Sequence, residues 1–380
     1  MKPFYNGLKL GILGGGQLGR MAIQEAISLN IHIAVLDPDS KAPCAEIANS
    51  FTLGSITDYD TVLTFGRNCD IITIEIEHVN TQALKQLEAE GKKVFPQPAI
   101  LEMVQDKGLQ KQFYAQHTIP TSNFILIENK NELSTCGIEF PLVQKLRKGG
   151  YDGKGVSVIK SLAELDKAFD APSVVEEMVK FRKEIAVIVS RNEKGETAAY
   201  PLVEMEFSAE ANLVEFLYWP TDESIDVQER AKAIAISVAE RTGIVGLLAV
   251  EMFLTDTDEI LVNEIAPRTH NSGHHTIEAA ATSQFMQHLR AVVGLSPGST
   301  AIKTPAAMIN LLGENGYSGN AHYEGLEEVL SWPGVYVHLY GKSQTKPFRK
   351  MGHITVTASN LETVKALAMK VKERVRVISN

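Results

Sequence analysis

The chain has 380 residues, of which 44% are hydrophobic and 22% charged, so we expect a folded protein of two or three domains. Its formal net charge of −9 argues against a nucleic-acid-binding surface, and the apolar run at residues 8–13 is too short to cross a membrane. Cys44, Cys69 and Cys136 form no C-x-x-C pair, which indicates neither a disulfide framework nor a zinc site and favours the cytoplasm.

The first hundred residues alternate between strand and helix signals. Buried apolar runs separated by crossover helices are typical of a parallel sheet, so we expect an α/β domain over residues 1–100, ended by Pro96 and Pro98. The expected strands are residues 8–13, 32–36, 71–76 and 93–95, and the expected helices are residues 17–29 and 81–89.

Two further domains are expected, over residues 101–180 and 181–380, which makes the fold class α/β and α+β. The middle domain has predicted strands at 142–146 and 156–159, joined by a glycine-rich hairpin at 148–155, and a helix near 162–169. The last domain combines predicted strands at 184–189, 213–219, 247–254, 259–265, 335–340 and 353–357 with helices at 227–242, 276–293 and 361–375.

The segment from Gly14 to Gly19 reads G-G-G-Q-L-G and fits the G-x-G-x-x-G pattern between a predicted strand and a predicted helix. Asp37, at the end of the next strand, stands where a dinucleotide-binding protein places the acid that holds a ribose hydroxyl. An NAD-dependent dehydrogenase is therefore one hypothesis, beside a simple anion site and a tight turn without any ligand. The pattern of parallel strands ends near residue 100. This leaves too few strands for the second mononucleotide-binding half that a dinucleotide-binding domain requires.

Two glutamates interrupt apolar strands on either side of a short acidic turn at residues 255–259. Glu251 lies in L-L-A-V-E-M-F-L and Glu264 in I-L-V-N-E-I-A, and so short a turn predicts an antiparallel hairpin on which both acids share one face. Two carboxylates on an apolar face favour a divalent cation, and Mg²⁺ commonly joins carboxylates to nucleotide phosphates. The competing interpretation is that each glutamate faces solvent or pairs with a buried arginine such as Arg268.

Lys145 lies in the apolar segment P-L-V-Q-K-L and needs an anion, for which phosphate is suitable. The next loop, K-G-G-Y-D-G-K-G, has four glycines whose N–H groups could fold over phosphates, but it is no Walker A loop and could equally be an exposed hairpin. Glu176 and Glu177 end the middle domain and Glu184 opens the next strand. Acids at this junction could accept hydrogen bonds from adenine or ribose, or could be ordinary surface residues.

Taken together, these residues resemble the ATP-grasp superfamily and, within it, the N5-carboxyaminoimidazole ribonucleotide synthetases. Four segments occur in that family's order and approximate spacing: GILGGGQLGRM, QKLRKGGYDGKGV, VNEIAPRTHNSGHHTIEA and YGK…RKMGHITV. The resemblance implies an ATP-grasp architecture with a Rossmann-like N-terminal domain (1–100), a linker helix and small lid (101–180), and an ATP-grasp body with a C-terminal extension (181–380). Many ATP-grasp relatives have an asparagine where this chain has Ala266, and the synthetase branch also lacks that asparagine. Phe207 stands where relatives often have histidine.

The resemblance also implies a cofactor site for ATP and a metal site for Mg²⁺, with Mn²⁺ as a possible substitute. Two lysines would contact the phosphates, the glycine-rich loop would close over them, and the acids at the domain junction would hold adenine and ribose. The cofactor residues are Lys107, Lys145, Gly150, Tyr151, Asp152, Gly153, Lys154, Gly155, Val156, Glu176, Glu177, Met178, Val179, Glu184, Asn263 and Glu264. The metal ligands are Glu251 and Glu264.

The acceptor implied by the resemblance is 5-aminoimidazole ribonucleotide. Its binding residues would be Gln17, Glu75, Tyr151, Asp152, Lys154, Asn271, Lys342, Arg349 and Lys350, the last three around its phosphate. The residues assigned to catalysis are Arg268, His270 and Lys350, with Arg268 and His270 where bicarbonate is activated.

The activity implied is ATP- and bicarbonate-dependent carboxylation of this acceptor to N5-carboxyaminoimidazole ribonucleotide through carboxyphosphate, in de novo purine biosynthesis. ADP and phosphate are released, which makes the expected enzyme an ATP-dependent C–N ligase. A cytoplasmic homodimer is expected, with small-molecule substrates and neither nucleic acid nor membrane as partner. The alternatives within the superfamily are a formate-dependent glycinamide ribonucleotide transformylase and a biotin carboxylase-like subunit. A catalytically dead nucleotide-binding regulator is a third.

Overall fold

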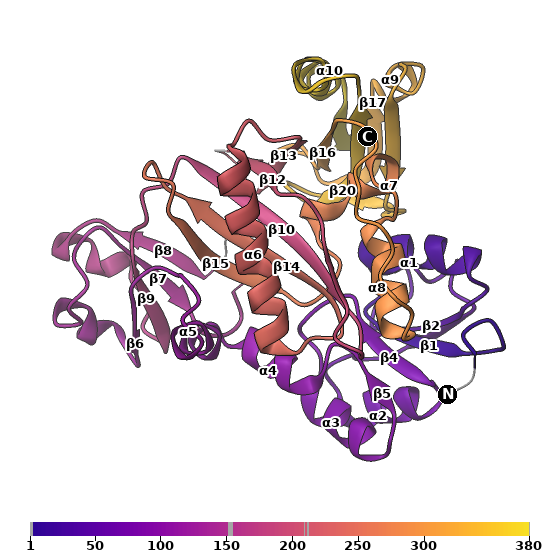
Figure 1. Cartoon of the computed structure of the whole chain (residues 1–380), viewed down its shortest axis with the longest axis horizontal. Coiled ribbons are helices and arrows are strands. Elements are labelled where there is room, and N and C mark those ends of the chain that lie inside the picture. The colour runs from indigo at the N-terminus through magenta and orange to yellow at the C-terminus, as the bar shows by residue number, and fades with distance from the viewer. Residues whose placement is uncertain (1–2, 151–154, 209, 211–212, 380) are drawn as a thin grey trace.

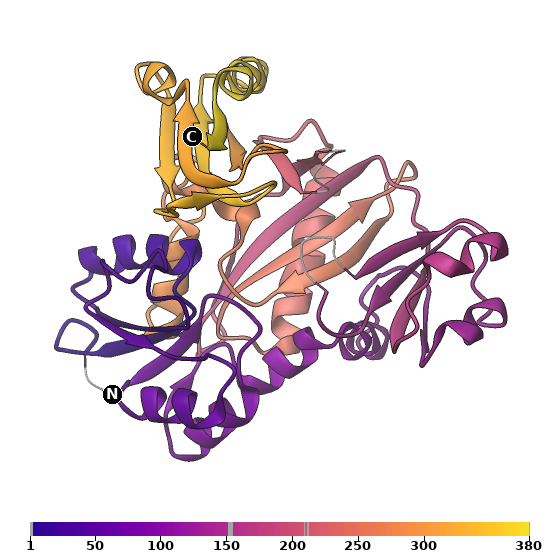
Figure 2. The ribbon, with the colours of Figure 1, turned by 180° about the vertical axis from the view of Figure 1, so that it is seen from behind.

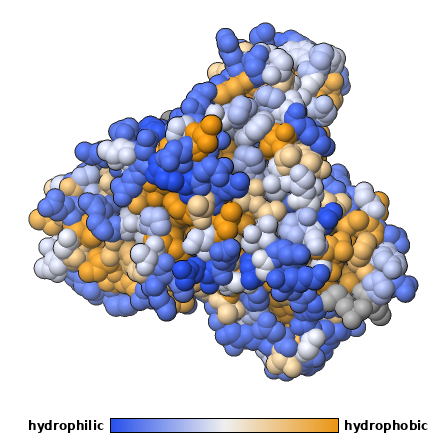
Figure 3. Space-filling view, viewed as in Figure 1, coloured by the Kyte–Doolittle hydropathy of each residue, from blue (hydrophilic) through white to orange (hydrophobic). Residues whose placement is uncertain are grey.

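The computed structural model describes residues 3–150, 155–208, 210 and 213–379. A long central sheet has three other parts around it: an N-terminal α/β part, a small four-stranded sheet and a C-terminal part that projects from one end (Figures 1 and 2). Hydrophilic residues cover much of the face in Figure 3, interrupted by smaller hydrophobic areas. Among the described helices, none is both long enough and apolar enough to span a bilayer.

The N-terminal part is a parallel sheet, as predicted. It has five strands in the order β3-β2-β1-β4-β5, and β3 and helix α2 were not expected. Side-chain caps begin two of its helices: Asp58 accepts from Thr61 N at α2, and Asn80 accepts from Ala83 N at α3. The elements are β1 (Lys9–Leu13), α1 (Gln17–Ser28), β2 (His32–Asp37), β3 (Ser50–Leu53), α2 (Tyr59–Arg67), β4 (Ile71–Ile74), α3 (Thr81–Ala89) and β5 (Lys93–Val94).

Two helices, α4 (Pro98–Gln105) and α5 (Lys107–Gln116), lead into the four-stranded sheet. Pro98 stands in the first turn of α4, and the Asp106 carboxylate caps α5 by accepting from two of its free N–H groups. The sheet has the order β6-β9-β7-β8, and the predicted helix near 162–169 is a 3₁₀ helix. Its elements are β6 (Phe124–Ile127), η1 (Lys130–Ser134), β7 (Leu142–Leu146), β8 (Val156–Ile159), η2 (Leu162–Lys167) and β9 (Ser173–Glu177).

The central sheet is antiparallel, with the order β15-β14-β10-β12-β13-β16-β20-β18 and β11 paired to β10. Helix α6 packs against β10 and β14 over the largest hydrophobic cluster, and left-handed Gly243 (φ 66°) ends it. The elements are β10 (Lys183–Arg191), β11 (Thr197–Ala199), β12 (Val203–Phe207), β13 (Val214–Trp219), α6 (Ile225–Thr242), β14 (Gly246–Leu254), β15 (Ile260–Ala266), β16 (Ala306–Leu312), β18 (Val335–Leu339) and β20 (Lys350–Thr357).

The single helix predicted over residues 276–293 is wrong. A 3₁₀ turn (η3, Asn271–Gly273) and a short helix (α7, Thr276–Ala279) precede a separate helix (α8, Gln284–Val292). The chain leaves the helical path because Ala280 forms a β-bridge with Ile302, and Ser283 then caps α8 by accepting from Met286 N. Helix α8 contacts both α1 and β14, so it joins the N-terminal part to the central sheet.

The C-terminal part adds a three-stranded sheet, in the order β19-β17-β21, to the end of the central sheet. Helix α10 packs on β16 and β20 over a hydrophobic cluster that includes Val364, Ala368 and Val371. The remaining elements are β17 (Gly319–Glu324), α9 (Leu326–Val329), β19 (Gln344–Thr345), α10 (Leu361–Arg374) and β21 (Arg376–Ser379).

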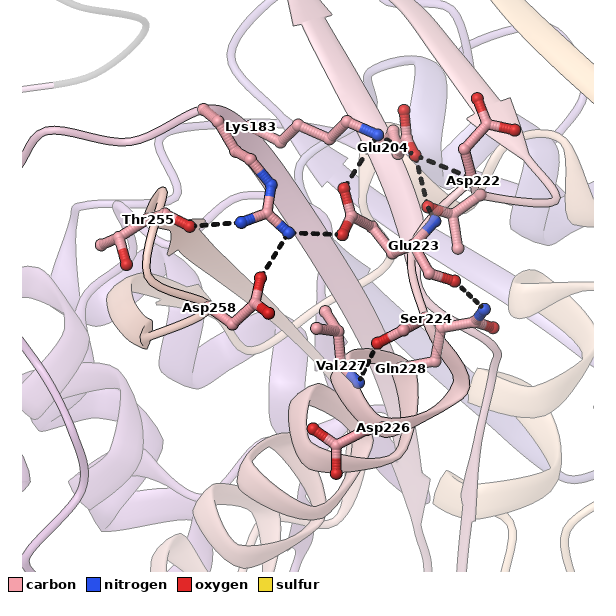
Figure 4. Close-up of polar contacts among 12 residues, drawn as sticks. Lys183, Glu204, Asp222, Glu223, Ser224, Asp226, Val227, Gln228, Thr255 and Asp258 are labelled. Atoms are coloured by element: carbon pink, nitrogen blue, oxygen red, sulfur yellow. Dashed lines mark hydrogen bonds and ion pairs between the residues drawn. The ribbon is translucent and has the colours of Figure 1, made fainter.

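A charged network fixes the start of β10, where the four-stranded sheet connects to the central one (Figure 4). The Arg182 guanidinium lies 2.6 Å from carboxylate oxygens of both Glu223 and Asp258, and it donates to the carbonyl of Thr255 at 2.6 Å. The neighbouring lysine, Lys183, contacts Glu223 at 2.9 Å. The network thereby ties the connection to the β14–β15 turn and to the segment before α6.

Candidate functional site

Strands β14 and β15 pair with Glu251 opposite Glu264, so both side chains project from the same face of the sheet. The register then shifts, because Met252 lies opposite Val262 and leaves Asn263 as an extra residue. Such a bulge bends the strand and re-aims side chains. The predicted hairpin with its two acids on one face is confirmed, whereas the bulge was not predicted.

Each glutamate of this pair contacts a cationic or histidine side chain. Lys107 Nζ lies 2.5 Å from Glu264 Oε2, and His270 Nε2 lies 3.0 Å from Glu251 Oε1. The Lys107 ammonium is the main reason that the pKa of Glu264 is lowered to about 2. The partner suggested by the competing interpretation, Arg268, forms its ion pair with a different carboxylate.

Lys145 lies at the same place, as predicted, and joins the two sheets. Its Nζ is 2.9 Å from Glu176 Oε1 and donates to Asn263 Oδ1 at 2.8 Å. Glu176 also contacts Lys111 Nζ at 3.0 Å and accepts from Ser122 Oγ at 2.6 Å. Burial acts to raise the pKa of Glu176, but the two ammonium groups outweigh it and hold that pKa at about 2.

Lys111 and Ser122 are site residues that the sequence analysis missed. Lys111 is almost fully buried, and burial lowers its pKa to about 8. A signal was present, because Lys107 and Lys111 are four residues apart and therefore lie on one face of a helix. Ser122 gave no such signal, since only the folded chain brings it to Glu176.

The segment after β9 supplies the other predicted nucleotide contacts. Glu184, on β10 opposite Phe253, has its pKa raised to about 7 by burial, with a contribution from Glu251. Met178 is exposed and Val179 half-buried just beyond β9. The alternation of side chains along β9 places Glu177 on the face opposite Glu176, where it is exposed. The structure therefore does not bring the Glu177 side chain to this site.

The glycine-rich loop joins β7 to β8, and only its ends are described. Gly149 and Gly155 have positive φ values of 80° and 78°, which glycine adopts without strain. A side chain at Gly155 would meet Gly150 Cα at 3.1 Å, so the neck of the hairpin is narrow. Val156 begins β8 beside this neck. The predicted loop residues that lie outside the described residues are Tyr151, Asp152, Gly153 and Lys154.

The first glycine motif is occupied by the chain's own carboxylates. Leu18 N donates to Glu75 Oε1 at 3.1 Å, and Gly15 N donates to Asp37 Oδ2 at 2.6 Å. A side chain at Gly16 would come within 2.4 Å of Glu75 Oε1, so the glycine is needed for this internal contact. The dinucleotide hypothesis loses its geometric basis, because Asp37 is held by the loop and the N-terminus of α1 is filled by Glu75.

The two residues assigned to bicarbonate contact different carboxylates. Arg268 Nε is 2.8 Å from Glu77 Oε1, and His270 reaches Glu251 as described above. The neighbouring amide nitrogen, Asn271 Nδ2, is buried without a hydrogen-bond partner among the residues that the structure describes. A buried donor in this state is suited to a ligand oxygen.

The predicted phosphate cluster lies in the C-terminal part, next to the N-terminal domain. Lys342 Nζ donates to the carbonyl of Lys350 at 2.7 Å, and Arg349 donates to a backbone carbonyl in β19 at 2.7 Å. Tyr340, just before Lys342, packs with residues of α1, the helix that Gln17 begins. Burial raises the pKa of the nearby Glu75 carboxyl, and the positive charges of Arg268 and Lys342 oppose that increase. The structure therefore brings the glycine loop and the cationic segment together.

Three family models match consecutive parts of the chain. The ribonucleotide synthetase preATP-grasp domain matches residues 8–105, the ATP-grasp domain matches residues 112–285, and the phosphoribosylaminoimidazole carboxylase C-terminal domain matches residues 306–367.

Curated relatives match nearly the whole chain. An N5-carboxyaminoimidazole ribonucleotide synthase from Synechococcus elongatus is 38% identical over 360 residues, which cover 92% of this chain and 89% of that protein. A chloroplastic phosphoribosylaminoimidazole carboxylase from Vigna aconitifolia is 38% identical over 94% of this chain, but the chain spans only 65% of that protein's length.

Solved structures share the whole architecture. The N5-carboxyaminoimidazole ribonucleotide synthetase from Thermotoga maritima has a TM-score of 0.91 and 42% sequence identity, covering 98% of this chain and 100% of that chain. The synthase from Aspergillus clavatus, solved with ADP and 5-aminoimidazole ribonucleotide, has a TM-score of 0.89 and 34% identity, covering 97% of this chain and 98% of that chain. With the fold, the hairpin carboxylates and these matches in agreement, the chain belongs to the N5-carboxyaminoimidazole ribonucleotide synthase family of ATP-grasp enzymes.

Proposed function

We propose that the chain carboxylates 5-aminoimidazole ribonucleotide at the expense of ATP and bicarbonate, giving N5-carboxyaminoimidazole ribonucleotide, ADP and phosphate in de novo purine biosynthesis. This activity is supported by the names of the Synechococcus and Thermotoga relatives and by the ligands of the Aspergillus structure. The single observation that carries the proposal is the cross-strand pair Glu251–Glu264 with Lys107 and Lys145 beside it.

In this proposal ATP lies between the four-stranded sheet and the central sheet, with residues 101–180 as linker and lid and residues 181–380 as body. Lys107 and Lys145 contact the phosphates, while Glu176 and Glu184 hold adenine and ribose near Met178 and Val179. Lys145 supports this placement, because it already joins Glu176 of one sheet to Asn263 of the other. The loop from Gly150 to Val156 covers the phosphates, a role that rests on the family resemblance.

Glu251 and Glu264 fit Mg²⁺, or Mn²⁺ in its place. Within the described ranges no cluster of three or more His, Cys, Asp and Glu side chains is placed to hold a metal alone. A pair of carboxylates on one sheet face suits Mg²⁺, which takes one or two carboxylates together with nucleotide phosphates. When bound, the ion would neutralise charge that develops on the transferring phosphoryl group.

The chemistry proceeds in two steps. A bicarbonate oxygen bonds to the γ-phosphorus while the bond to ADP breaks, which forms carboxyphosphate. The exocyclic amine of the acceptor then attacks the carboxyl carbon and loses a proton, and phosphate leaves. Arg268 can hold the planar bicarbonate through two parallel hydrogen bonds. His270 contacts Glu251, one of the two carboxylates proposed to bind the metal ion. The covering loop protects carboxyphosphate from water.

The acceptor occupies the region between the first glycine loop and the C-terminal cluster. Gln17, Glu75 and Asn271 face its ribose and imidazole, and the buried, unpartnered Asn271 amide supports a ligand there. The phosphate-binding residues are Lys342, Arg349 and Lys350, and those whose roles rest on resemblance alone are Tyr151, Asp152 and Lys154.

We also propose a cytoplasmic homodimer. All three cysteines, Cys44, Cys69 and Cys136, are free thiols, which suits a reducing compartment. Light scattering of the purified chain tests the dimer.

ADP release measured with a panel of acceptors tests the activity. Release is expected only when bicarbonate and 5-aminoimidazole ribonucleotide are both present. Release that depends on formate and glycinamide ribonucleotide, or on biotin, would instead identify the corresponding ATP-grasp relative. Absence of ADP release under every condition would indicate a nucleotide-binding regulator.

A further inference from the structure

Gln284, the first residue of α8, is fully buried and uses its whole side-chain amide on the loop that carries His270. Its Oε1 accepts from His270 N at 2.8 Å, and its Nε2 donates to His270 O at 2.7 Å. The second Nε2 hydrogen is donated to His274 Nδ1 at 3.0 Å. The amide therefore clamps the backbone of one residue on both sides and leaves no hydrogen-bonding group unused.

The imidazole of His270 is fixed in turn by the loop that Gln284 clamps. Its Nδ1 accepts from the backbone N–H of Ser272 at 3.3 Å and lies 2.9 Å from Ser272 Oγ. A nitrogen that accepts from an N–H carries no proton, so the ring proton is on Nε2 and is directed at Glu251 Oε1, 3.0 Å away. Backbone position thus determines which nitrogen faces the carboxylate.

The packing around the clamp leaves little freedom. Gly273 has no side chain, and a Cβ there would come within 2.6 Å of both Gln284 Cδ and Oε1. The ring of His274 stacks on Phe285 at 5.8 Å, and burial holds the pKa of His274 well below its usual range, so its Nδ1 remains a neutral acceptor.

From these contacts we propose that Gln284 is a positioning residue for the carboxylation reaction, which orients His270 toward Glu251 by holding its backbone. The inference rests on the proposed function, because His270 acts on bicarbonate only if that function is correct. Gln284 touches neither substrate nor nucleotide in this assignment, and its effect is transmitted through His270.

The same helix contains a matched control. Gln287 is also fully buried, and it clamps Gly298 in the same way: Nε2 donates to Gly298 O at 2.7 Å and Oε1 accepts from Gly298 N at 2.8 Å. Gly298 is not among the predicted site residues. Replacing either glutamine by methionine removes one backbone clamp at nearly constant volume. Gln284→Met also removes the hydrogen bond to His274, so it is expected to lose slightly more stability than Gln287→Met.

The test compares Gln284→Met with Gln287→Met in bicarbonate- and acceptor-dependent ADP release. The melting temperatures should agree within about 2 °C. Gln284→Met should lose about 10- to 100-fold in kcat with the KM values for ATP and acceptor nearly unchanged, while Gln287→Met keeps wild-type kcat. Equal kcat values in the two variants would overturn the proposal. Wild-type protein in the same assay distinguishes failure of this proposal from failure of the proposed function. Only failure of the proposed function would abolish ADP release by the wild-type protein.

A second measurement is independent of turnover. Spectra of ¹⁵N-histidine-labelled protein report the tautomer of His270, whose signal is identified by its loss in His270→Gln. The Nε2-protonated form should persist in wild type and Gln287→Met and should mix with the other tautomer in Gln284→Met; an unchanged signal would refute the clamp. If Gln284→Met does not fold, Gln284→Glu is measured instead, and failure of both to fold would assign Gln284 a purely structural role and overturn the proposal.

Discussion

Replacing Glu264 by glutamine is expected to abolish turnover while the fold survives. The main loss is a negative charge opposite Glu251, at the place proposed for Mg²⁺ and the transferring phosphoryl group. Removing one stabilising group from such a site costs about 10²- to 10³-fold in kcat. The stability cost is smaller. A pKa of about 2 instead of the ordinary 4.5 corresponds to about 3 kcal/mol, and the 43% exposure of the Glu264 side chain reduces this to about 1–2 kcal/mol.

The two effects are measured separately, by ADP release under saturating substrates and by urea unfolding. Glu259→Gln is the matched control, because Glu259 is an exposed acid on the turn of the same hairpin and should keep full activity. A Glu264→Gln enzyme with turnover within about tenfold of wild type would refute the metal assignment. A variant that no longer unfolds cooperatively would show that Glu264 is needed for folding rather than for chemistry.

Three further perturbations test other parts of the site. Burial raises the pKa of Glu184 to about 7, so between about pH 4.5 and pH 7 the folded chain retains a proton that the unfolded chain releases. The stability that this proton binding contributes is full below pH 4.5 and is lost as the pH rises through 7. Glu184→Gln should therefore stabilise the protein at about pH 8, by at most about 3 kcal/mol, and should not stabilise it at about pH 4.5. Melting curves at both pH values check this, and equal differences would contradict it. Lys145→Met should lower kcat/KM for ATP by at least about tenfold, because Glu176 and the phosphates lose a shared cation; unchanged kinetics would exclude that role. Arg182→Met should cost about 2–4 kcal/mol in the free energy of urea unfolding. Arg230→Met breaks an exposed ion pair with Asp226 and one exposed hydrogen bond to the carbonyl of Asp258, and it should cost about 1 kcal/mol or less. Similar costs for the two variants would count against the network of Figure 4.

The features that the sequence predicted correctly depend on short distances along the chain. Glu251 and Glu264 could be paired because the turn between them is short and strand alternation then decides which face they share. The parallel N-terminal sheet followed from buried runs and crossover helices, and the terminal helix from its 3.6-residue period.

The features that were missed depend on contacts between distant segments. The bulge at Asn263 is a property of a paired register and leaves no local pattern. The break in the helix predicted over 276–293 comes from the β-bridge of Ala280, after which Ser283 caps a separate helix. Glu75 occupies the first glycine loop from 57 positions away, so a correct motif led toward a ligand whose place the chain itself fills.

The central sheet has a further consequence for substrate size. The hairpin with Glu251 and Glu264 and the strand that begins at Lys350 belong to one continuous hydrogen-bonded ladder. Paired strands resist changes in their spacing, so in the proposed assignment the sheet holds the phosphoryl-transfer site at a fixed distance from Lys350, one of the residues proposed to bind the acceptor's phosphate. In that assignment, an acceptor with a shorter or longer distance between its amine and its phosphate is expected to be a poor substrate, because neither end of the sheet can move to meet it.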